Sequence, residues 1–153
     1  MSKIQFMYNF VSPNDSISNK DHQNVAKILS VDATVTIRVD DKLYFETELA
    51  ILEFYKALWQ WKESVTDEQI PPFHYYTVEY ADYEEGAILS LLPCGSNATI
   101  HSIWAEQPLE NMFKCDEIIS VFLQLEMDLK RAIEQYFNID MLKFLNHIPV
   151  QRS

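Results

Sequence analysis

Apolar and polar residues alternate most regularly along residues 32–39, and this alternation predicts a β-strand. One face of the strand carries apolar side chains, Ala33, Val35, Ile37 and Val39. The other face carries polar side chains, Asp32, Thr34, Thr36 and Arg38. We therefore expect the apolar set to be buried and Thr34 and Thr36 to be more exposed. A weaker alternation predicts another strand at residues 3–11, and a short apolar repeat predicts one or two helical turns near 25–29.

Asp40 and Asp41 separate the regular strand from residues 42–46, in which Leu43 and Phe45 continue the buried face. Two β segments joined by two turn-forming residues predict a hairpin. Thr47 belongs to the residue types that cap helix N-termini, so we expect a helix over residues 48–64.

The polar residues of this helix form one narrow stripe, made of Glu53, Lys56, Gln60 and Glu63, which we expect to face solvent. Trp59 and Trp61 project about 200° apart on the helix, so both can be covered only if two layers flank it. If either tryptophan is exposed, it is a candidate contact for self-association or for a partner.

The rest of the chain predicts three short strands and a long helix. Strands are expected at residues 74–80, 87–92 and 99–105, with short turns between them, which is typical of an antiparallel meander. An apolar repeat with steps of three and four predicts a helix over residues 116–137. A packed turn at 141–145 is expected after it.

The order of these elements predicts an α+β protein, with one antiparallel sheet (the hairpin plus the three-strand meander) covered by two helices. A length of 153 residues fits one domain, residues 1–153, and no linker or internal repeat divides it.

Charge is concentrated in the middle third of the chain. No lysine or arginine lies between Lys62 and Lys114, and these 51 residues hold nine acids, which account for −9 of the net charge of −11. A solubilising surface is one interpretation of this bias, and a patch that attracts a basic partner is the other. Ordinary surfaces mix both signs of charge, so the absence of basic residues favours the partner. Binding to nucleic acid is disfavoured, because phosphate contacts need clustered Lys and Arg.

Tyrosines are interleaved with these acids. Tyrosine combines a rigid apolar ring with a polar hydroxyl and is enriched in protein interfaces, although strand packing alone also explains tyrosines in a strand. The predicted partner-binding residues are Tyr75, Tyr80, Asp82, Tyr83, Glu84 and Glu85.

No motif indicates catalysis, a cofactor or a metal. Gly86 and Gly95 are the two glycines, and neither lies in a phosphate-binding loop pattern. Cys94, His101 and Cys115 match no zinc spacing, and we expect both cysteines to be reduced, half-buried thiols. A nucleophilic Cys94 assisted by His74 or His101 is disfavoured in so acidic a region. We predict no catalytic, cofactor-binding or metal-binding residues, and activity as an enzyme stays the least favoured class.

No segment has the length and apolarity of an export signal or a membrane span, which predicts a cytoplasmic protein that does not enter membranes.

The run Glu48-Leu-Ala-Ile-Leu-Glu-Phe-Tyr-Lys-Ala-Leu-Trp-Gln-Trp61, with the hairpin before it and the helix at 113–137 after the meander, resembles small uncharacterised bacterial proteins of Bacillus-type genomes. Some of these resemble immunity partners of secreted toxins. The resemblance implies an inhibitory binding protein and assigns no functional residue. The leading hypothesis is an acidic module that binds a basic protein, for example an immunity-type inhibitor of a basic toxin or enzyme. The alternative is a homo-oligomeric scaffolding domain joined through a helix face.

Overall fold

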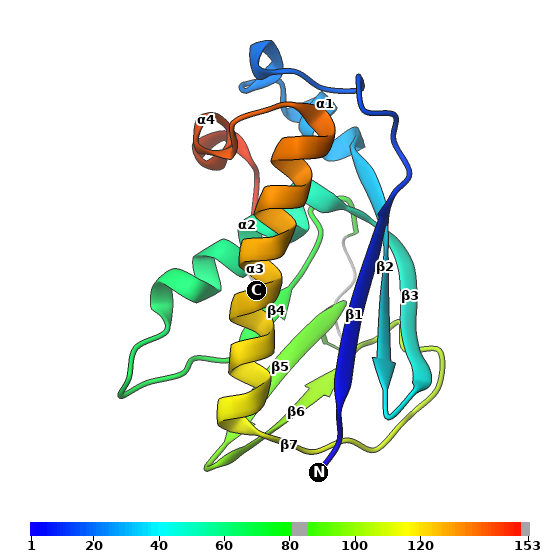
Figure 1. The fold of residues 1–153 in the computed structure, drawn as a ribbon, viewed down its shortest axis with the longest axis vertical. Coiled ribbons are helices and arrows are strands. Elements are labelled where there is room, and N and C mark those ends of the chain that lie inside the picture. The colour runs from blue at the N-terminus through cyan, green and yellow to red at the C-terminus, as the bar shows by residue number, and fades with distance from the viewer. Residues whose placement is uncertain (81–85, 151–153) are drawn as a thin grey trace.

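Two antiparallel sheets and a set of helices build the fold, as the computed structural model of the chain shows for residues 1–80 and 86–150 (Figure 1). The first sheet has the order β1-β2-β3 and the second has the order β4-β5-β6-β7. The strands are β1 (Ile4–Phe10), β2 (Asp32–Val39), β3 (Lys42–Ala50), β4 (Phe73–Tyr75), β5 (Leu89–Cys94), β6 (Asn97–His101) and β7 (Phe113–Lys114). The α-helices are α1 (Val25–Ser30), α2 (Ile51–Ser64), α3 (Cys115–Phe137) and α4 (Met141–Phe144), with 3-10 turns η1 (Asn19–Asp21) and η2 (Leu145–His147).

The α+β class is confirmed, but the single sheet is wrong, because β3 and β4 do not pair. Strand β3 leads directly into α2, and the chain returns as β4 in a separate sheet. The meander itself is present, but β4 and β6 are shorter than predicted and β5 begins two residues later than predicted. Strand β4 ends at Tyr75, after which the N–H of Tyr80 donates to the carbonyl of Thr77. The short strand β7, which pairs with β6, has no counterpart in the prediction.

The predicted start of α2 is also wrong, because β3 continues to Ala50 and the helix begins at Ile51. Thr47 lies within the strand, paired with Val35. Pairing with β2 extends as far as Asp32 opposite Ala50, and the N–H of Ile51 donates to the Val31 carbonyl over 3.0 Å. These long-range hydrogen bonds outweigh the local capping preference of Thr47.

Strand β2 lies at the centre of its sheet and buries its apolar face as predicted, with Ala33, Val35, Ile37 and Val39 all in the core. Thr34 is half-buried, whereas Thr36, which was expected to be more exposed, is buried. Thr36 is flanked by Met7 of β1 and Glu46 of β3, and its hydroxyl donates to the Glu46 carboxylate over 3.0 Å. Longer neighbours on both sides therefore shield a small side chain on a central strand.

A bulge changes which residues of β3 face the core. The register slips between Ile37 and Arg38, so that Phe45 pairs with Ile37 but Leu43 pairs with Arg38. Tyr44 is consequently buried beside Phe45, and Leu43 is only half-buried, contrary to the prediction. Asp40 and Asp41 both have positive φ, which is the type I′ geometry that suits a two-residue hairpin.

The polar stripe of α2 is not solvated along its whole length, because Glu53 and Lys56 are buried. The ammonium of Lys56 donates to the carbonyls of Leu145 and Ile148, at the C-terminal end of the described chain. The spacing of polar residues along a helix is the same whether their side chains face water or form hydrogen bonds inside the protein.

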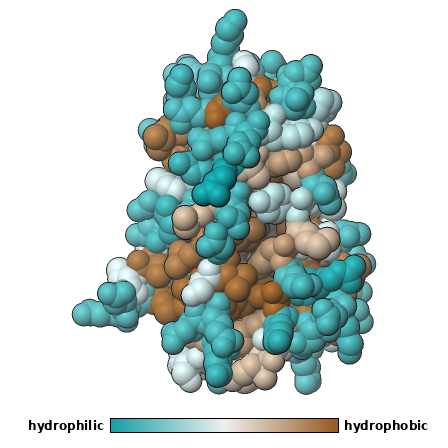
Figure 2. Space-filling model, viewed as in Figure 1, coloured by the Kyte–Doolittle hydropathy of each residue, from teal (hydrophilic) through white to brown (hydrophobic). Residues whose placement is uncertain are grey.

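Helix α3 packs against both sheets (Figure 1). Its bounds agree with the prediction to within one residue. The ring of Phe122 lies 5.3 Å from Phe6 of β1 and 5.7 Å from Phe73 of β4, with near-perpendicular packing at Phe6. On the face that α3 crosses, Figure 2 shows hydrophobic residues gathered in a band between hydrophilic ends. Across the described ranges, no helix combines the length and apolarity needed to cross a bilayer.

Candidate functional site

Of the predicted partner-binding residues, Tyr75 and Tyr80 can be placed, whereas Asp82, Tyr83, Glu84 and Glu85 lie outside the described residues. Tyr75 and Tyr80 line the same cavity, which has a volume of about 330 Å³. Tyr75 is buried, and Tyr80 is half-buried. We call this cavity the acidic pocket; its lining residues are Asp32, Glu48, Leu49, Ala50, Tyr75, Thr77, Glu79, Tyr80 and Trp104.

Three carboxylates from separate segments line the acidic pocket. Asp32 begins β2, Glu48 lies near the end of β3, and Glu79 follows β4. Burial raises the pKa of Asp32, and the negative charges of Glu48 and Glu79 raise it further. Glu48 and Glu79 therefore both repel a negative charge on Asp32, and a cation placed beside Asp32 would relieve that repulsion.

Aromatic rings form the other side of the acidic pocket. The rings of Tyr80 and Trp104 lie 5.6 Å apart in an edge-to-face arrangement. Aromatic faces attract Lys and Arg side chains through the negative charge of the ring face, most strongly for tryptophan. Carboxylates and aromatic faces together make a pocket suited to the side chain of a basic residue.

A buried carboxylate lies directly behind the acidic pocket. Glu53 of α2 accepts a hydrogen bond of 2.8 Å from the Tyr75 hydroxyl and one of 3.0 Å from the N–H of Val78. These two bonds fix the tyrosine and the chain segment that leads to Glu79. Within residues 1–80 and 86–150, no basic side chain forms an ion pair with Glu53.

Sequence reasoning did not name Asp32, Glu48, Glu79 or Trp104 as binding residues, and all four line the acidic pocket. Asp32 lies in the strand predicted at residues 32–39, and Glu48 lies two residues beyond the strand predicted at 42–46. Nothing in the local sequence indicates that either residue lies near Glu79. Trp104 was placed in a strand at 99–105, whereas β6 ends at His101. The one available signal was the absence of basic residues between Lys62 and Lys114, which includes Glu79 and Trp104.

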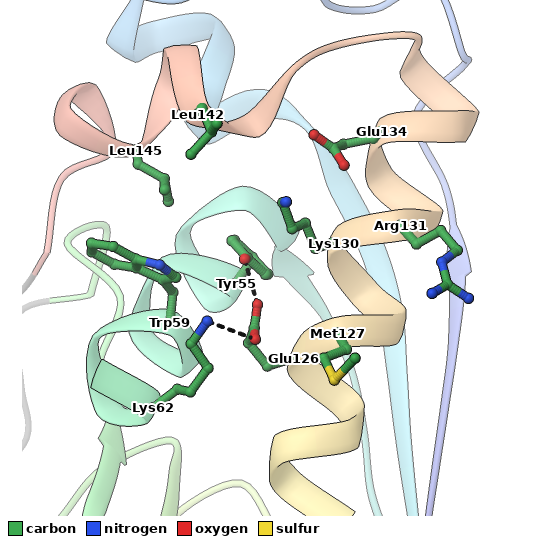
Figure 3. Close-up of a pocket in the computed structure, with 10 residues that line it drawn as sticks. All are labelled: Tyr55, Trp59, Lys62, Glu126, Met127, Lys130, Arg131, Glu134, Leu142 and Leu145. Atoms are coloured by element: carbon green, nitrogen blue, oxygen red, sulfur yellow. Dashed lines mark hydrogen bonds and ion pairs between the residues drawn. The ribbon is translucent and has the colours of Figure 1, made fainter. Parts of the chain in front are cut away.

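A second cavity, of about 440 Å³, lies between α2, α3 and the α4–η2 segment (Figure 3). Its polar floor is a network centred on Glu126, whose side chain is 3% exposed. The Tyr55 hydroxyl donates to Glu126 over 2.5 Å, and the Lys62 ammonium lies 3.1 Å from the other carboxylate oxygen. Burial, followed by this hydrogen bond and the charge of Glu126, raises the pKa of Tyr55. The network ties α2 to α3 and keeps its polar groups engaged with one another.

The two tryptophans of α2 have different surroundings, as their opposite directions predicted. Trp61 is buried, with its ring 6.2 Å from Phe73 and 5.8 Å from Phe122. Trp59 is half-buried and forms one wall of the second cavity (Figure 3). The Lys56 ammonium lies 5.9 Å from the Trp59 ring centre. Helix α2 is thus covered on two sides, and Trp59 is the tryptophan that stays accessible.

The residues considered for metal binding or nucleophilic chemistry are dispersed. Cys94 is exposed and Cys115 is buried, both as free thiols, so neither is half-buried as predicted. His74 lies with its Nδ1 2.7 Å from the Ser90 hydroxyl. In the part of the chain that the structure describes, no three His, Cys, Asp or Glu side chains are grouped closely enough to hold a metal ion.

Fold and site together define an α+β protein with two antiparallel sheets and an acidic, aromatic pocket. Residues 6–135 match the family described as Domain of unknown function (DUF7878), and the chain belongs to that family. The matched range contains every residue that lines the acidic pocket. No curated protein and no solved structure matches the chain.

Proposed function

We propose that the protein is a binding module that recognises a basic protein partner by receiving a Lys or Arg side chain in the acidic pocket. The observation that carries this proposal is the convergence of Asp32, Glu48 and Glu79 with the Trp104 ring on one cavity. An immunity-type inhibitor that covers the basic surface of a toxin or enzyme in the cytoplasm would be such a module.

Charge and shape both support this assignment. The chain carries a net charge of −11, so a basic partner is attracted from a distance before any contact forms. At the pocket, burial and then the charges of Glu48 and Glu79 raise the pKa of Asp32, and the same carboxylates would attract a cation. The Tyr75–Glu53 hydrogen bond holds one wall in place, which lowers the entropic cost of binding.

A pair of peptides tests the pocket directly. Acetyl-Gly-Arg-Gly-amide should bind more tightly than the peptide with citrulline in place of arginine, because citrulline has nearly the same shape and no charge. Titrations followed by NMR should show the arginine peptide shifting the Trp104 indole N–H signal. Equal affinities for the two peptides would overturn the proposal.

Single substitutions locate the binding. Glu79→Gln and Trp104→Leu should each weaken binding of the arginine peptide by about fivefold, through loss of a charge contact and of a cation–π contact respectively. Glu68→Gln is the matched control, since Glu68 is an exposed acid of the same acidic third and does not line the pocket. An equal loss in the Glu68 variant would reassign the effect to net charge.

The protein partner is tested with the same variants as baits. Wild-type protein should retain a basic protein from native lysate, and the Glu79→Gln, Trp104→Leu double variant should not retain it. Retention of the same protein by both baits would show that the pocket is not the binding surface.

A further inference from the structure

Strand β1 is an edge strand, and half of its backbone groups point away from the sheet. The Lys3 carbonyl accepts from the N–H of Asp40, and the N–H of Val11 donates to the Asp32 carbonyl, both over 2.9 Å. Hydrogen-bonded positions recur at every second residue of an antiparallel pair, so the odd-numbered residues of β1 bond to β2. The outward N–H and C=O groups belong to Ile4, Phe6, Tyr8 and Phe10.

These outward groups have no protein partner in the described ranges, because no backbone or side-chain hydrogen bond reaches them. Edge strands are usually protected by charge, proline, a bulge or shortness. The sequence of β1, Ile-Gln-Phe-Met-Tyr-Asn-Phe, contains no charged residue, proline or glycine, and its pairing with β2 is regular over seven residues. The strand is therefore open to pairing with another strand.

The two faces of β1 are also incompletely covered. On the inner face, Phe6 contacts Phe122 and Phe10 stacks on Tyr136 at 4.5 Å, yet all four inward-facing side chains of β1 are only half-buried. On the outer face, Met7 lies at the middle of the strand and is 50% exposed. A neighbouring strand would cover both the aromatic row and the methionine.

We propose that β1 pairs in antiparallel fashion with β1 of a second copy of this chain, which joins two three-stranded sheets into a continuous one. The pairing that uses the whole strand has its two-fold axis at Met7. Phe6 then lies opposite Tyr8 of the second copy, and Ile4 lies opposite Phe10. The two Met7 side chains meet at a position where no hydrogen bonds form and where side chains approach most closely.

A second copy fits this edge better than an unrelated strand for two reasons. First, the pairing is self-complementary, since it places the same half-buried aromatic row beside itself. Second, β1 carries no charge of its own, so two copies of the strand can pair without placing like charges against each other, even though the two chains, each of net charge −11, repel at a distance. Asp128 is close enough to raise, after burial, the pKa of Tyr8, so two copies of Asp128 flank the contact and salt should strengthen the association.

Sedimentation velocity of the full chain over a range of concentrations tests the dimer. Met7→Lys should raise the dimer dissociation constant by about hundredfold, because it places two like charges face to face on the axis. Met127→Lys is the matched control, since Met127 is 53% exposed on α3 and lies outside the contact. A wild-type protein that is monomeric throughout, or a Met7→Lys variant that still dimerises, would overturn the proposal.

Disulfide formation tests the register separately, in a Cys94→Ser background that removes the exposed thiol. Met7→Cys should crosslink two copies on oxidation, because facing residues at such a position have the separation that a disulfide spans. Gln5→Cys should not crosslink, since residue 5 faces residue 9 of the second copy. Crosslinking of the two variants to the same extent would reject the register centred on Met7.

Discussion

The two proposed binding surfaces, the acidic pocket and the edge of β1, differ in the means of recognition that they offer. The pocket gathers charged and aromatic side chains from β2, β3, the segment after β4 and the chain after β6. The β1 edge offers the backbone of one continuous segment without a single charge. As proposed, the first selects a partner by the charge of one side chain, whereas the second pairs with β1 of a second copy through backbone hydrogen bonds and an apolar row.

This difference separates the two surfaces experimentally. Salt screens both interactions, with opposite consequences for binding. It weakens the attraction between the acidic pocket and a cation, so binding there becomes weaker. It also weakens the repulsion between two acidic copies, so pairing at β1 becomes stronger. A binding event at either surface can therefore be assigned by the sign of its response to ionic strength, before any residue is changed.

The largest effect is expected from removing all three carboxylates of the acidic pocket. The triple variant Asp32→Asn, Glu48→Gln, Glu79→Gln should bind the arginine peptide about hundredfold more weakly, because each lost charge contact contributes on the order of 1 kcal/mol. Its self-association should be unchanged or stronger, since the net charge is lower. Calorimetry and sedimentation on the same samples check both. Loss of self-association in this variant would show that the two surfaces are not separate.

A smaller effect, with opposite signs, is expected from salt. Raising ionic strength from about 0.05 M to about 0.5 M should weaken binding of the arginine peptide by roughly tenfold and should lower the dimer dissociation constant. The citrulline peptide serves as the uncharged control. If salt moved the two dissociation constants in the same direction, the contrast between the surfaces would be abandoned.

The smallest effect concerns stability. The pKa of Asp32 is raised by burial and then by Glu48 and Glu79, so the folded protein holds this proton more tightly than the unfolded chain. The resulting stabilisation is present at low pH and is lost as the pH rises through the folded-state pKa.

At pH 7, Asp32→Asn should therefore raise the free energy of unfolding, and the gain should disappear below the unfolded-state pKa of about 4. Urea denaturation at several pH values measures this, with Asp67→Asn, at an exposed acid, as control. If Asp32→Asn gains stability and also loses affinity for the arginine peptide, the repulsion of Asp32 by Glu48 and Glu79 costs stability at the same residues that bind the peptide. A destabilised variant at pH 7 would contradict this account of Asp32.

Local patterns predicted the elements of this fold well and their assembly poorly. The bounds of α3 and β2 follow from regular apolar periodicity, which depends on neighbours a few residues apart. The division into two sheets depends on whether β3 and β4 meet, and no local feature of either strand decides that. The bulge at Tyr44 and the extension of β3 to Ala50 likewise arise from pairing with β2.

The candidate site shows the same division. Composition pointed to the acidic third, and Tyr75 and Tyr80 were identified as candidates within it. Asp32 and Glu48 come from outside that third, and only the tertiary structure places them beside Glu79. Glu53 was assigned to a solvated stripe, because the spacing of polar residues on a helix does not distinguish water from a buried tyrosine hydroxyl as the partner.

The burial of Lys56 bears on where a shorter fragment of this protein can be cut. The family match ends at residue 135, yet the carbonyls that accept from the Lys56 ammonium belong to Leu145 and Ile148. A fragment trimmed to the matched range would keep the donor and discard both acceptors, so the Lys56 ammonium would lose both of these hydrogen bonds. The core would also lose Phe144 and Leu145, both of which are buried in the intact chain. A fragment that keeps these contacts therefore has to extend through Ile148, beyond the last residue of the family match.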